Sequence, residues 1–548
     1  MTRDELLAPP DYVPTLPNTF RLGADNFGSR IMMVQGERRL TFRDAERQSA
    51  ILARRLLAAG VGKGTRIGVL MPNSPDWVVT FLAITRIGAI AVLISTLYQR
   101  RELAWVIRHA DLHALFMADA FLSHDYVGRL EEIAPDLREQ TSERPLLLEA
   151  LPFLRTAYVW GDNVPAWAVD ARTMLREDPQ AADEAWLTAV EQAVTPADLA
   201  LLIYTSGTTA DPKGVIHSHG PVVRRSYATR SGRRYTPDSR ILVLGPFCWV
   251  AGLLAFFVSW NMGSCIVIPV TPKQEDVAAA AIAEDVTEIS AQPALIKHLR
   301  EYLALHDLTP GPGLADYFDG PREANGEPVP ANRQSRGLGM TETIAMHSFE
   351  PGGVMPPDKV GAFGRAVPDI ERAIRDFETG ETLGPNQEGQ LWLRGPGMMQ
   401  GMYKKERHEV FDADGFYATG DICSIDEDGY LYFRGRKGEM IKTTGANVSP
   451  REVELALEAF PDVQEAGVFS LPGEGHDEIV AAVVAPRGEV KIDADELRRR
   501  LRQDISSFKV PKIIHIVPIE HLPRTGSGKL NKRVVKETLL RGEPLVRA

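Results

Sequence analysis

Residues Tyr204 to Val215 have the sequence Y-T-S-G-T-T-A-D-P-K-G-V and directly follow the apolar run 199–203. A run of that length and character predicts a strand. Glycine lets a backbone approach a ligand closely, successive N–H groups in such a turn bind anions, and hydroxyl and ammonium groups add donors. The stretch therefore predicts a loop that binds the phosphates of a nucleotide. Its donors are Thr205, Ser206, Gly207, Thr208, Thr209 and Lys213.

The loop is not a kinase-type P-loop. That motif requires glycine before its lysine and serine or threonine after it. Here Pro212 precedes Lys213 and Gly214 follows it. An ordinary turn rich in glycine, serine and threonine is the alternative interpretation. The paired threonines and the Pro-Lys-Gly ending favour phosphate binding.

This stretch resembles the phosphate loop of the adenylate-forming superfamily, which contains acyl- and aryl-CoA synthetases, peptide-synthetase adenylation domains and beetle luciferases. The family pattern is Y-T-S-G-T-T-G-x-P-K-G-V, and the chain departs from it at Ala210, where glycine is usual. The added methyl group restricts φ, so we expect a slightly different loop conformation. The resemblance is closest to the AMP-forming acyl-CoA synthetases and covers about residues 40–540.

A second motif, G-M-T-E-T at residues 339–343, resembles the family's Y-G-x-T-E-T. The resemblance implies that Thr341 donates to the α-phosphate and that the Glu342 carboxylate binds Mg²⁺, which prefers oxygen ligands. It places Leu338 and Gly339 in the substrate pocket. Leu338 stands where the family has an aromatic residue, so adenine stacking on that side is expected to be weaker. A Thr-Glu pair alone would more simply cap a helix.

Ribose binding is implied by Y-A-T-G-D at residues 417–421, which resembles the family's T-G-D. A carboxylate can accept from two hydroxyls, so Asp421 is expected to bind both ribose oxygens. Arg436 is the family's second ribose contact. Two residues later the family has a pivot between its domains, here Gly438.

The C-terminal part carries two further motifs. Gly445, in a glycine turn before an amphipathic helix, matches the position that lines the pantetheine tunnel of CoA ligases. Lys529, in P-R-T-G-S-G-K-L at 523–530, matches the lysine that serves adenylation. The resemblance implies that a rotation about Gly438 brings the two motifs to the active site in turn.

The acyl site carries the largest departures from the family. Trp249 falls where many acyl-CoA synthetases have a histidine beside the acyl carboxylate, and a core tryptophan is the alternative interpretation. Residues 309–337 contain no apolar strand followed by the family's G-G-A-P-L turn. A pocket wall built from this region must therefore differ, and the sequence does not name the acid.

Length and pattern predict the architecture. A chain of 548 residues is too long for one core. We expect an α/β protein with a large N-terminal domain of several subdomains and mainly parallel sheets at 1–434, and a small mobile α+β domain at 435–548. Within it, 66–95 predicts a β-α-β unit after a helix that begins at Thr41 and runs to about Ala59. Residues 1–40 show little pattern, and 121–196 are expected to form peripheral helices and loops.

Composition limits the binding partners and cellular compartments that we expect for this protein. The net charge of −11 argues against a broad nucleic-acid surface. Three scattered cysteines and no apolar leader predict a reducing cytoplasm. The uncharged stretch 241–272 is interrupted by proline and glycine, so we expect a strand, a buried helix and a second strand rather than a membrane span.

Two basic features have alternative interpretations. The five arginines between 222 and 235 predict a solvated basic face, with an anion or peripheral membrane site as the alternative. The His217-x-His219 pair has no evident third metal ligand nearby.

The resemblance implies an AMP-forming acid–thiol ligase of the kind found in fatty acid metabolism. It would activate a carboxylic acid with Mg-ATP to acyl-AMP and transfer the acyl group to CoA. An amide-forming or carrier-protein ligase and a nucleotide-binding relative without catalysis remain as alternatives. An amino-acid substrate is disfavoured because residues 247–256 offer no acidic partner for an ammonium group. The oligomeric state is left open, with a homodimer as one candidate.

Overall fold

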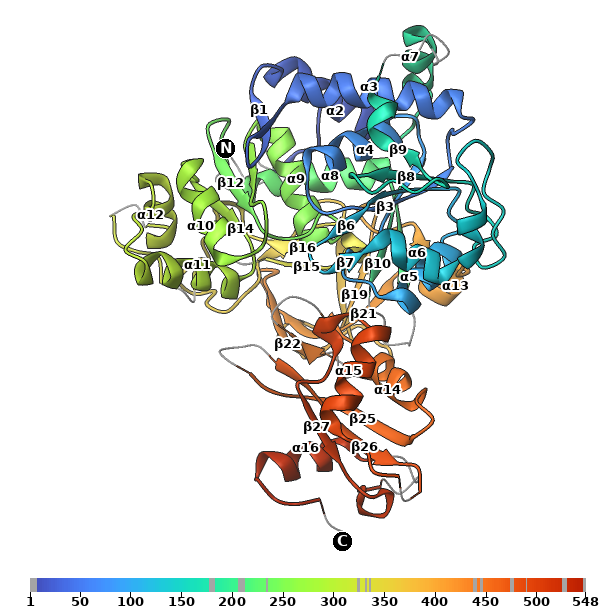
Figure 1. Ribbon diagram of the computed structural model, residues 1–548. Coiled ribbons are helices and arrows are strands. Elements are labelled where there is room, and N and C mark those ends of the chain that lie inside the picture. The colour runs from blue at the N-terminus through green and yellow to red at the C-terminus, as the bar shows by residue number, and fades with distance from the viewer. Residues whose placement is uncertain are drawn as a thin grey trace.

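The computed structural model describes residues 7–176, 183–205, 212–232, 235–322, 326–330, 333–334, 337–436, 441–443, 447–473, 478–488, 490–524 and 530–545. Figure 1 shows a large body built from the N-terminal four-fifths of the chain and a small body that carries the C-terminus. This arrangement confirms the predicted fold class.

An eight-stranded sheet forms the centre of the large body, in the order β20-β11-β10-β4-β3-β5-β8-β9. Its neighbours from β10 to β9 run parallel, whereas β11 is antiparallel to both β10 and β20. The strands are β3 (Arg66–Leu70), β4 (Ile90–Leu93), β5 (Ala114–Ala118), β8 (Thr156–Trp160), β9 (Val169–Asp170), β10 (Leu199–Thr205), β11 (Lys213–Ser218) and β20 (Gly401–Met402).

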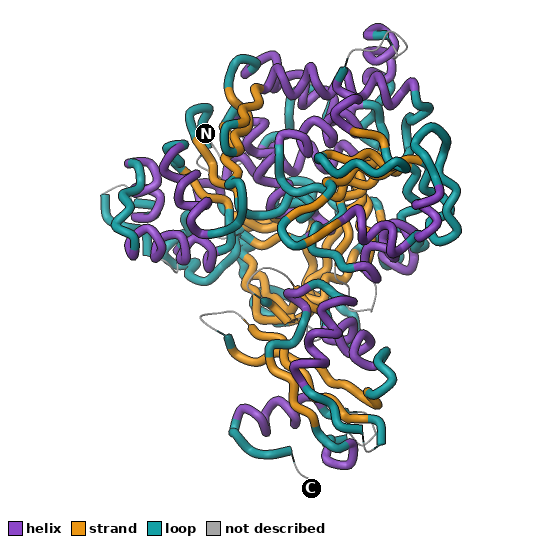
Figure 2. Tube along the Cα trace, in the orientation of Figure 1, coloured by secondary structure: helices purple, strands orange, loops and turns teal. Residues whose placement is uncertain are grey.

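A second sheet of five strands has the order β14-β12-β13-β1-β2 and is parallel except at β1–β2. Its strands are β1 (Ile31–Gln35), β2 (Arg38–Thr41), β12 (Arg240–Val243), β13 (Cys265–Ile268) and β14 (Glu288–Ser290). Figure 2 shows helices packed around the strands of the large body. They are α2 (Leu16–Phe27), α3 (Phe42–Ala58), α4 (Pro75–Arg86), α5 (Arg100–His109), α6 (Tyr126–Ile133), α7 (Glu184–Gln192), α8 (His219–Thr229), α9 (Val250–Met262), α10 (Gln274–Ala283), α11 (Pro293–Leu305), α12 (Pro312–Asp319) and α13 (Arg407–Val410).

The predicted β-α-β unit is confirmed as β3, α4 and β4. The Thr41 hydroxyl accepts from the Asp44 N–H at 3.0 Å and begins α3, and the Ser74 hydroxyl accepts from the Trp77 N–H at 3.1 Å and begins α4. The uncharged stretch forms β12, the buried helix α9 and β13, as predicted. No helix in the described ranges is long and apolar enough to cross a membrane.

Two predictions about this body were wrong. Residues 1–40, expected to lack pattern, contain α2 and the sheet strands β1 and β2. Residues 121–196, expected to be peripheral, contribute β8, which pairs with β5 along its whole length. The strands β1, β2 and β8 have at most five residues each, so their apolar runs were too short to stand out from the surrounding sequence.

Smaller sheets join the two bodies. A three-stranded sheet contains β15 (Leu338–Gly339), β16 (Met346–Phe349) and β17 (Arg365–Ala366). An antiparallel four-stranded sheet contains β18 (Glu371–Arg375), β19 (Gly389–Arg394), β21 (Tyr417–Ile425) and β22 (Leu431–Arg436). In Figure 1 the strands β19, β21 and β22 run from the large body toward the small one.

The small body is an α+β domain with its own apolar core. Its three-stranded sheet of β25 (Val463–Pro472), β26 (Glu478–Pro486) and β27 (Ile513–Ile516) packs with α14 (Pro450–Glu458), α15 (Ala494–Asp504) and α16 (Lys532–Leu540). A short ribbon of β23 (Ile441–Lys442) and β24 (Asn447–Val448) precedes them. The expected helix after the glycine turn is α14, with the Ser449 hydroxyl at its start.

The departure predicted for residues 309–337 is also seen. The described part of this region contains α12 and the isolated bridges Arg322–Pro328 and Gln334–Val354, but no strand. β14 is consequently the last strand on its side of the five-stranded sheet. The Tyr317 hydroxyl of α12 donates to the carbonyl of Ile289 in β14 at 3.1 Å.

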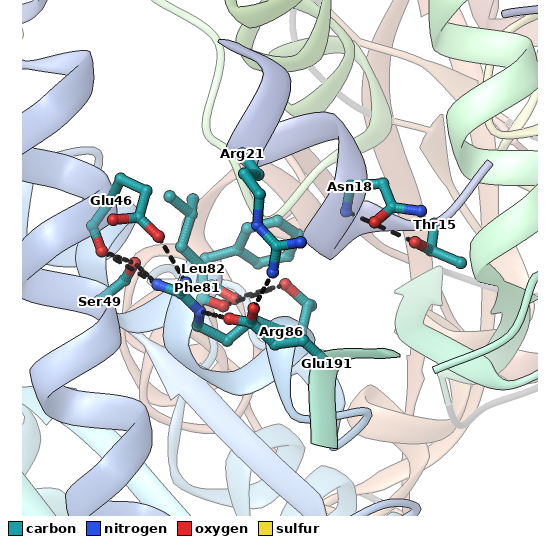
Figure 3. A network of polar contacts seen from close by, with 10 residues as sticks. Thr15, Asn18, Arg21, Glu46, Ser49, Phe81, Leu82, Arg86 and Glu191 are labelled. Carbon is teal, nitrogen blue, oxygen red and sulfur yellow. Dashed lines mark hydrogen bonds and ion pairs between the residues drawn. The ribbon is translucent and has the colours of Figure 1, made fainter. Parts of the chain in front are cut away.

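A buried ionic network joins α2, α3, α4 and α7 (Figure 3). The Arg86 side chain, 8% exposed, contacts Glu191 at 2.5 Å, Glu46 at 2.6 Å and the Ser49 hydroxyl at 2.8 Å. Arg21 forms a second ion pair with Glu191, whose side chain is 4% exposed. One guanidinium thus connects helices from three separate parts of the chain.

We expect Arg86→Met to lower the free energy of unfolding of the large body by about 3–5 kcal/mol, because it removes a partner from the buried Glu191 carboxylate and from the half-buried Glu46 carboxylate. Thermal and urea unfolding would measure the loss. Lys405→Met, which removes an exposed ion pair with Glu409, is the matched control and should leave the transition in place. Equal transitions for Arg86→Met and the parent would contradict this account of the network.

Candidate active site

The hairpin of β10 and β11 brings the two ends of the phosphate loop together. Thr205, the last residue of β10, lies directly opposite Lys213, the first residue of β11. These two predicted donors are therefore cross-strand neighbours. The predicted donors Ser206, Gly207, Thr208 and Thr209 lie outside the described residues. At the base of the loop, the Tyr204 hydroxyl contacts His109 Nδ1 of α5 at 2.8 Å.

His217 connects this hairpin to the second motif. Its Nε2 donates to the carbonyl of Thr341 at 2.7 Å, across 124 residues of sequence. Burial lowers the pKa of His217 to about 4, which keeps the ring neutral. His219 is also buried, and its Nδ1 accepts from the Leu16 N–H at 3.2 Å. Both histidine side chains form hydrogen bonds with backbone groups of distant segments, so the His-x-His pair has a structural role.

Backbone geometry holds residues 337–346 in a tight turn. A side chain at Gly339 would place its first carbon 2.6 Å from the carbonyl oxygen of Ala345, so glycine is required there. Ile344 adopts φ +53°, a left-handed conformation that is strained for a β-branched residue. Such strain persists where surrounding contacts compensate for it, and it gathers at functional sites. Between these two positions lies the 3₁₀ turn Thr341–Thr343.

Tyr417 joins Glu342 to the ribose motif. Its hydroxyl donates to Glu342 Oε1 at 3.0 Å, and the Met399 N–H donates to the Glu342 carbonyl at 2.8 Å. Tyr417 begins β21, and Asp421 lies four residues further along the same strand. Tyr417 is the first residue of the Y-A-T-G-D motif, and the motif by itself assigns it no role. Its contact with the Glu342 carboxylate is seen only in the folded structure.

Asp421 and Arg436 lie directly opposite each other on β21 and β22. Asp421 is 9% exposed, and its N–H donates to the Thr419 hydroxyl at 3.0 Å. The pairing places the two predicted ribose contacts at one position of the sheet, although the Arg436 side chain lies outside the described atoms.

The remaining predicted positions are distributed around this centre. Leu338 packs against the apolar cluster that includes Phe349, Leu391 and Cys423. Trp249 is half-buried directly before α9, and its ring lies edge-on to Phe508 of the small body, with centroids 6.1 Å apart. Gly438, Gly445 and Lys529 lie outside the described residues.

The arginines of 222–235 form neither a solvated face nor an anion site in the part that is described. Arg225 is 1% exposed and donates to the carbonyls of Met346 and Pro368. Arg224 pairs with Asp369 at 3.0 Å, and Arg230 lies over the Tyr227 ring. Burial lowers the pKa of Arg225 to about 10. These three arginines thus contribute to packing at and directly after α8. Counting charges along the sequence does not reveal such a role. The other two arginines, 233 and 234, lie outside the described residues.

The donor set around Glu342 fits magnesium. No group of three or more histidine, cysteine or acidic side chains gathers into a protein-only metal site within the described ranges. Mg²⁺ is usually held by one or two carboxylates together with substrate phosphates, so a single carboxylate near a phosphate loop matches it. A carboxylate has lone pairs for both the Tyr417 hydroxyl and a cation.

A cavity of about 240 Å³ lies at the carboxyl ends of strands from both large sheets. Its wall includes Thr96 and Leu97 after β4, Pro246 after β12, Val270 after β13 and Leu295 on α11. The lining is mostly apolar, with the amides of three further residues, Gln35, Asn73 and Gln274, among its polar groups. Ligands of open α/β sheets commonly bind at this end of the strands.

We expect Asp421→Ala to weaken ATP binding by about 1.5–3 kcal/mol, the range for a hydrogen bond to a charged group. Titration calorimetry would measure it. The control is Asp428→Ala, which removes an exposed carboxylate from the turn between the same two strands. Unchanged ATP affinity in Asp421→Ala would refute the ribose assignment.

Comparison with known proteins agrees with this geometry. The AMP-binding enzyme family matches residues 20–403, and the AMP-binding enzyme C-terminal domain matches 452–529. The chain is 28% identical to a 3-hydroxybenzoate/4-hydroxybenzoate–CoA ligase of Thauera aromatica, over 94% of this chain and 95% of that protein.

Two solved structures share the fold. An o-succinylbenzoate CoA synthetase of Bacillus subtilis, bound to a product analogue, superposes with a TM-score of 0.72 at 24% identity, over 95% of this chain and 98% of that one. An amide bond synthetase of Marinactinospora thermotolerans superposes with a TM-score of 0.74 at 23% identity, over 95% and 99% of the two chains.

Proposed function

The chain belongs to the AMP-binding enzyme family, and from this premise we propose that it is an AMP-forming acid–CoA ligase. It activates a carboxylic acid with ATP to acyl-AMP and pyrophosphate, and then transfers the acyl group to the thiol of CoA. The observation that carries the proposal is one chain of contacts. It runs from the Thr205–Lys213 pair through His217 to Thr341 and from Glu342 through Tyr417 to the strand of Asp421.

In the first step the acid's carboxylate oxygen attacks the α-phosphate of ATP and pyrophosphate leaves. Thr205, Lys213 and the rest of the loop hold the phosphates, and Thr341 donates to the α-phosphate. Asp421 and Arg436 hold the ribose, so the nucleotide is fixed at both ends. Glu342 would hold Mg²⁺, which neutralises phosphate charge when bound. Lys529 stabilises the charge that develops during attack. Catalysis here is mainly positioning and charge stabilisation.

In the second step the thiol attacks the acyl carbonyl and AMP leaves. We propose that the cavity beside Leu97 and Pro246 receives the pantetheine arm of CoA. Pro246 lies three residues before Trp249, so an arm in this cavity approaches the place expected for the acyl carboxylate. The resemblance to CoA ligases assigns Gly445, which lies outside the described residues, to the same path. We keep the domain boundary near residue 434, with the pivot at Gly438, as part of this proposal.

The acid remains to be identified, because the wall that usually shapes the acyl pocket differs here. The name of the relative from Thauera aromatica refers to two hydroxybenzoates, so substituted benzoates are the first substrates to test. The amide bond synthetase shares the fold, and an amine acceptor would require the same first step. The two reactions differ only in the nucleophile that displaces AMP.

The test is pyrophosphate release with Mg-ATP over a panel of aryl and aliphatic acids, with CoA or with simple amines as acceptors. We expect release that depends on one class of acid and that CoA accelerates, with acyl-CoA as product. Amide formation with no thioester would favour the amide ligase instead. ATP binding without turnover of any acid would identify a nucleotide-binding relative that lacks catalysis.

A further inference from the structure

A buried charged cluster lies where the small body contacts the large one. Lys509 Nζ is 2.6 Å from Glu102 Oε1 and 2.6 Å from Glu452 Oε1, and the three side chains are 2%, 4% and 5% exposed. Glu102 belongs to the first turn of α5 in the large body. Glu452 and Lys509 both belong to the small body, in α14 and in the 3₁₀ turn Ser507–Lys509. One ammonium group is therefore shared by carboxylates of both bodies.

Two residues that shortly precede Lys509 in the chain extend this contact. The Ser506 hydroxyl lies 2.8 Å from Glu102 Oε2 and 3.0 Å from the carbonyl oxygen of Leu97. Phe508 lies edge-on to Trp249. The docking surface thus reaches Leu97 in the cavity wall and Trp249, the residue expected beside the acyl carboxylate.

We expect the cluster to favour one orientation of the small body relative to the large one, and to contribute little to the overall free energy of unfolding. Burial disfavours the charged form of Lys509, yet the two carboxylates outweigh burial and raise its pKa, so the group stays charged. A buried ion pair repays its desolvation only when its geometry is good, and losing one partner leaves an uncompensated charge. Rotation of the small body would separate Glu102 from Lys509, while the Lys509–Glu452 pair would move as a unit.

The docked face is the one that carries α14. Glu452 lies in the first turn of that helix, seven residues after Gly445. Arg524 and Leu530, which flank the Lys529 segment, instead pack on β25 of the small body itself. Arg524 pairs with Glu465 at 2.7 Å, and Leu530 packs against Gly467.

We propose that Glu102, Ser506 and Lys509 form a latch that positions the small body for acyl transfer to the thiol. The latch must open before Lys529 can serve acyl-AMP formation. The proposal rests on the two-step function given above. Glu102 and Ser506 are thus positioning residues for the second step, and neither contacts the reacting atoms.

The sharpest variant is Glu102→Gln, which keeps the side-chain volume and an oxygen that can accept from the Gln99 N–H. It removes the charge from the large body alone and leaves the Lys509–Glu452 pair in place. We expect transfer from supplied acyl-AMP to CoA to fall on the order of tenfold, the lower end for a charged hydrogen bond. Acyl-AMP formation should be unchanged or faster. Lys529→Ala should show the opposite split, with slower acyl-AMP formation.

Two controls separate the latch from a general folding defect. Arg500→Gln removes an ion pair with Asp462 inside the small body and should change neither step. Glu102→Lys and Lys509→Glu should each impair transfer, whereas the double variant restores one positive and two negative charges and should recover most of the activity. Equal slowing of both steps in Glu102→Gln, or a double variant no better than the singles, would overturn the proposal.

Hydrogen exchange without substrates tests the latch independently of the reaction. We expect amides of 97–103 and 506–510 to exchange faster in Glu102→Gln than in the parent or in Arg500→Gln. Unchanged protection would overturn the latch even if the enzyme is a CoA ligase. A different result is also informative. If no acid in the panel released pyrophosphate while amide exchange in Glu102→Gln was faster than in the parent, the proposed ligase function would be wrong and the interdomain contact would stand.

Discussion

The antiparallel pairing of β10 with β11 is the constraint on which the site depends. It places Thr205 opposite Lys213 and, four residues later, directs His217 to the carbonyl of Thr341. A one-residue shift of register would turn His217 to the other face of the strand and leave that carbonyl without its donor. The parallel neighbour β4 supports β10, and the chain leaving β4 leads to Leu97 and α5. The phosphate loop, the turn of Glu342 and the docking surface therefore share one scaffold.

The candidate site residues could be predicted from the sequence because the motifs that contain them are local. Each of Lys213, Glu342 and Asp421 lies in a short stretch whose residue types already match a phosphate loop, a magnesium carboxylate or a ribose contact. The strands and helices of 41–95 were predictable because caps and apolar runs are also local signals. β8 was missed because a strand of five residues, in a region with acidic and proline-containing stretches, carries too little pattern.

The contacts between motifs could not be predicted in the same way. Tyr417 meets Glu342 across 75 residues, and Lys509 meets Glu102 across 407. Lys509 and Glu102 occupy unremarkable local patterns, whereas Glu342 and Tyr417 lie in motifs; in both cases only the packing of distant elements brings the partners together. Arg225 shows the converse error, since a charge counted as surface is buried against backbone carbonyls.

The altered region 309–337 and the interdomain cluster bear on different parts of the reaction. Among the described strands, β14 is the last on its side of the five-stranded sheet, and the sequence that follows lacks the family's strand and turn, so we expect differences in acid selection there. The residues that we propose to bind the nucleotide lie on other elements. Acid preference can thus diverge while the adenylation chemistry is retained.

We infer that these contacts form a site for reversible acyl-AMP formation. Exchange of labelled pyrophosphate into ATP measures that step alone, because it requires the acid and Mg²⁺ but no acceptor. We expect the exchange of pyrophosphate into ATP to depend on the acid and to proceed without CoA. Asp421→Ala and Lys529→Ala should each lower its rate. Exchange that proceeds without any acid, or none with any acid while ATP binds, would contradict this inference.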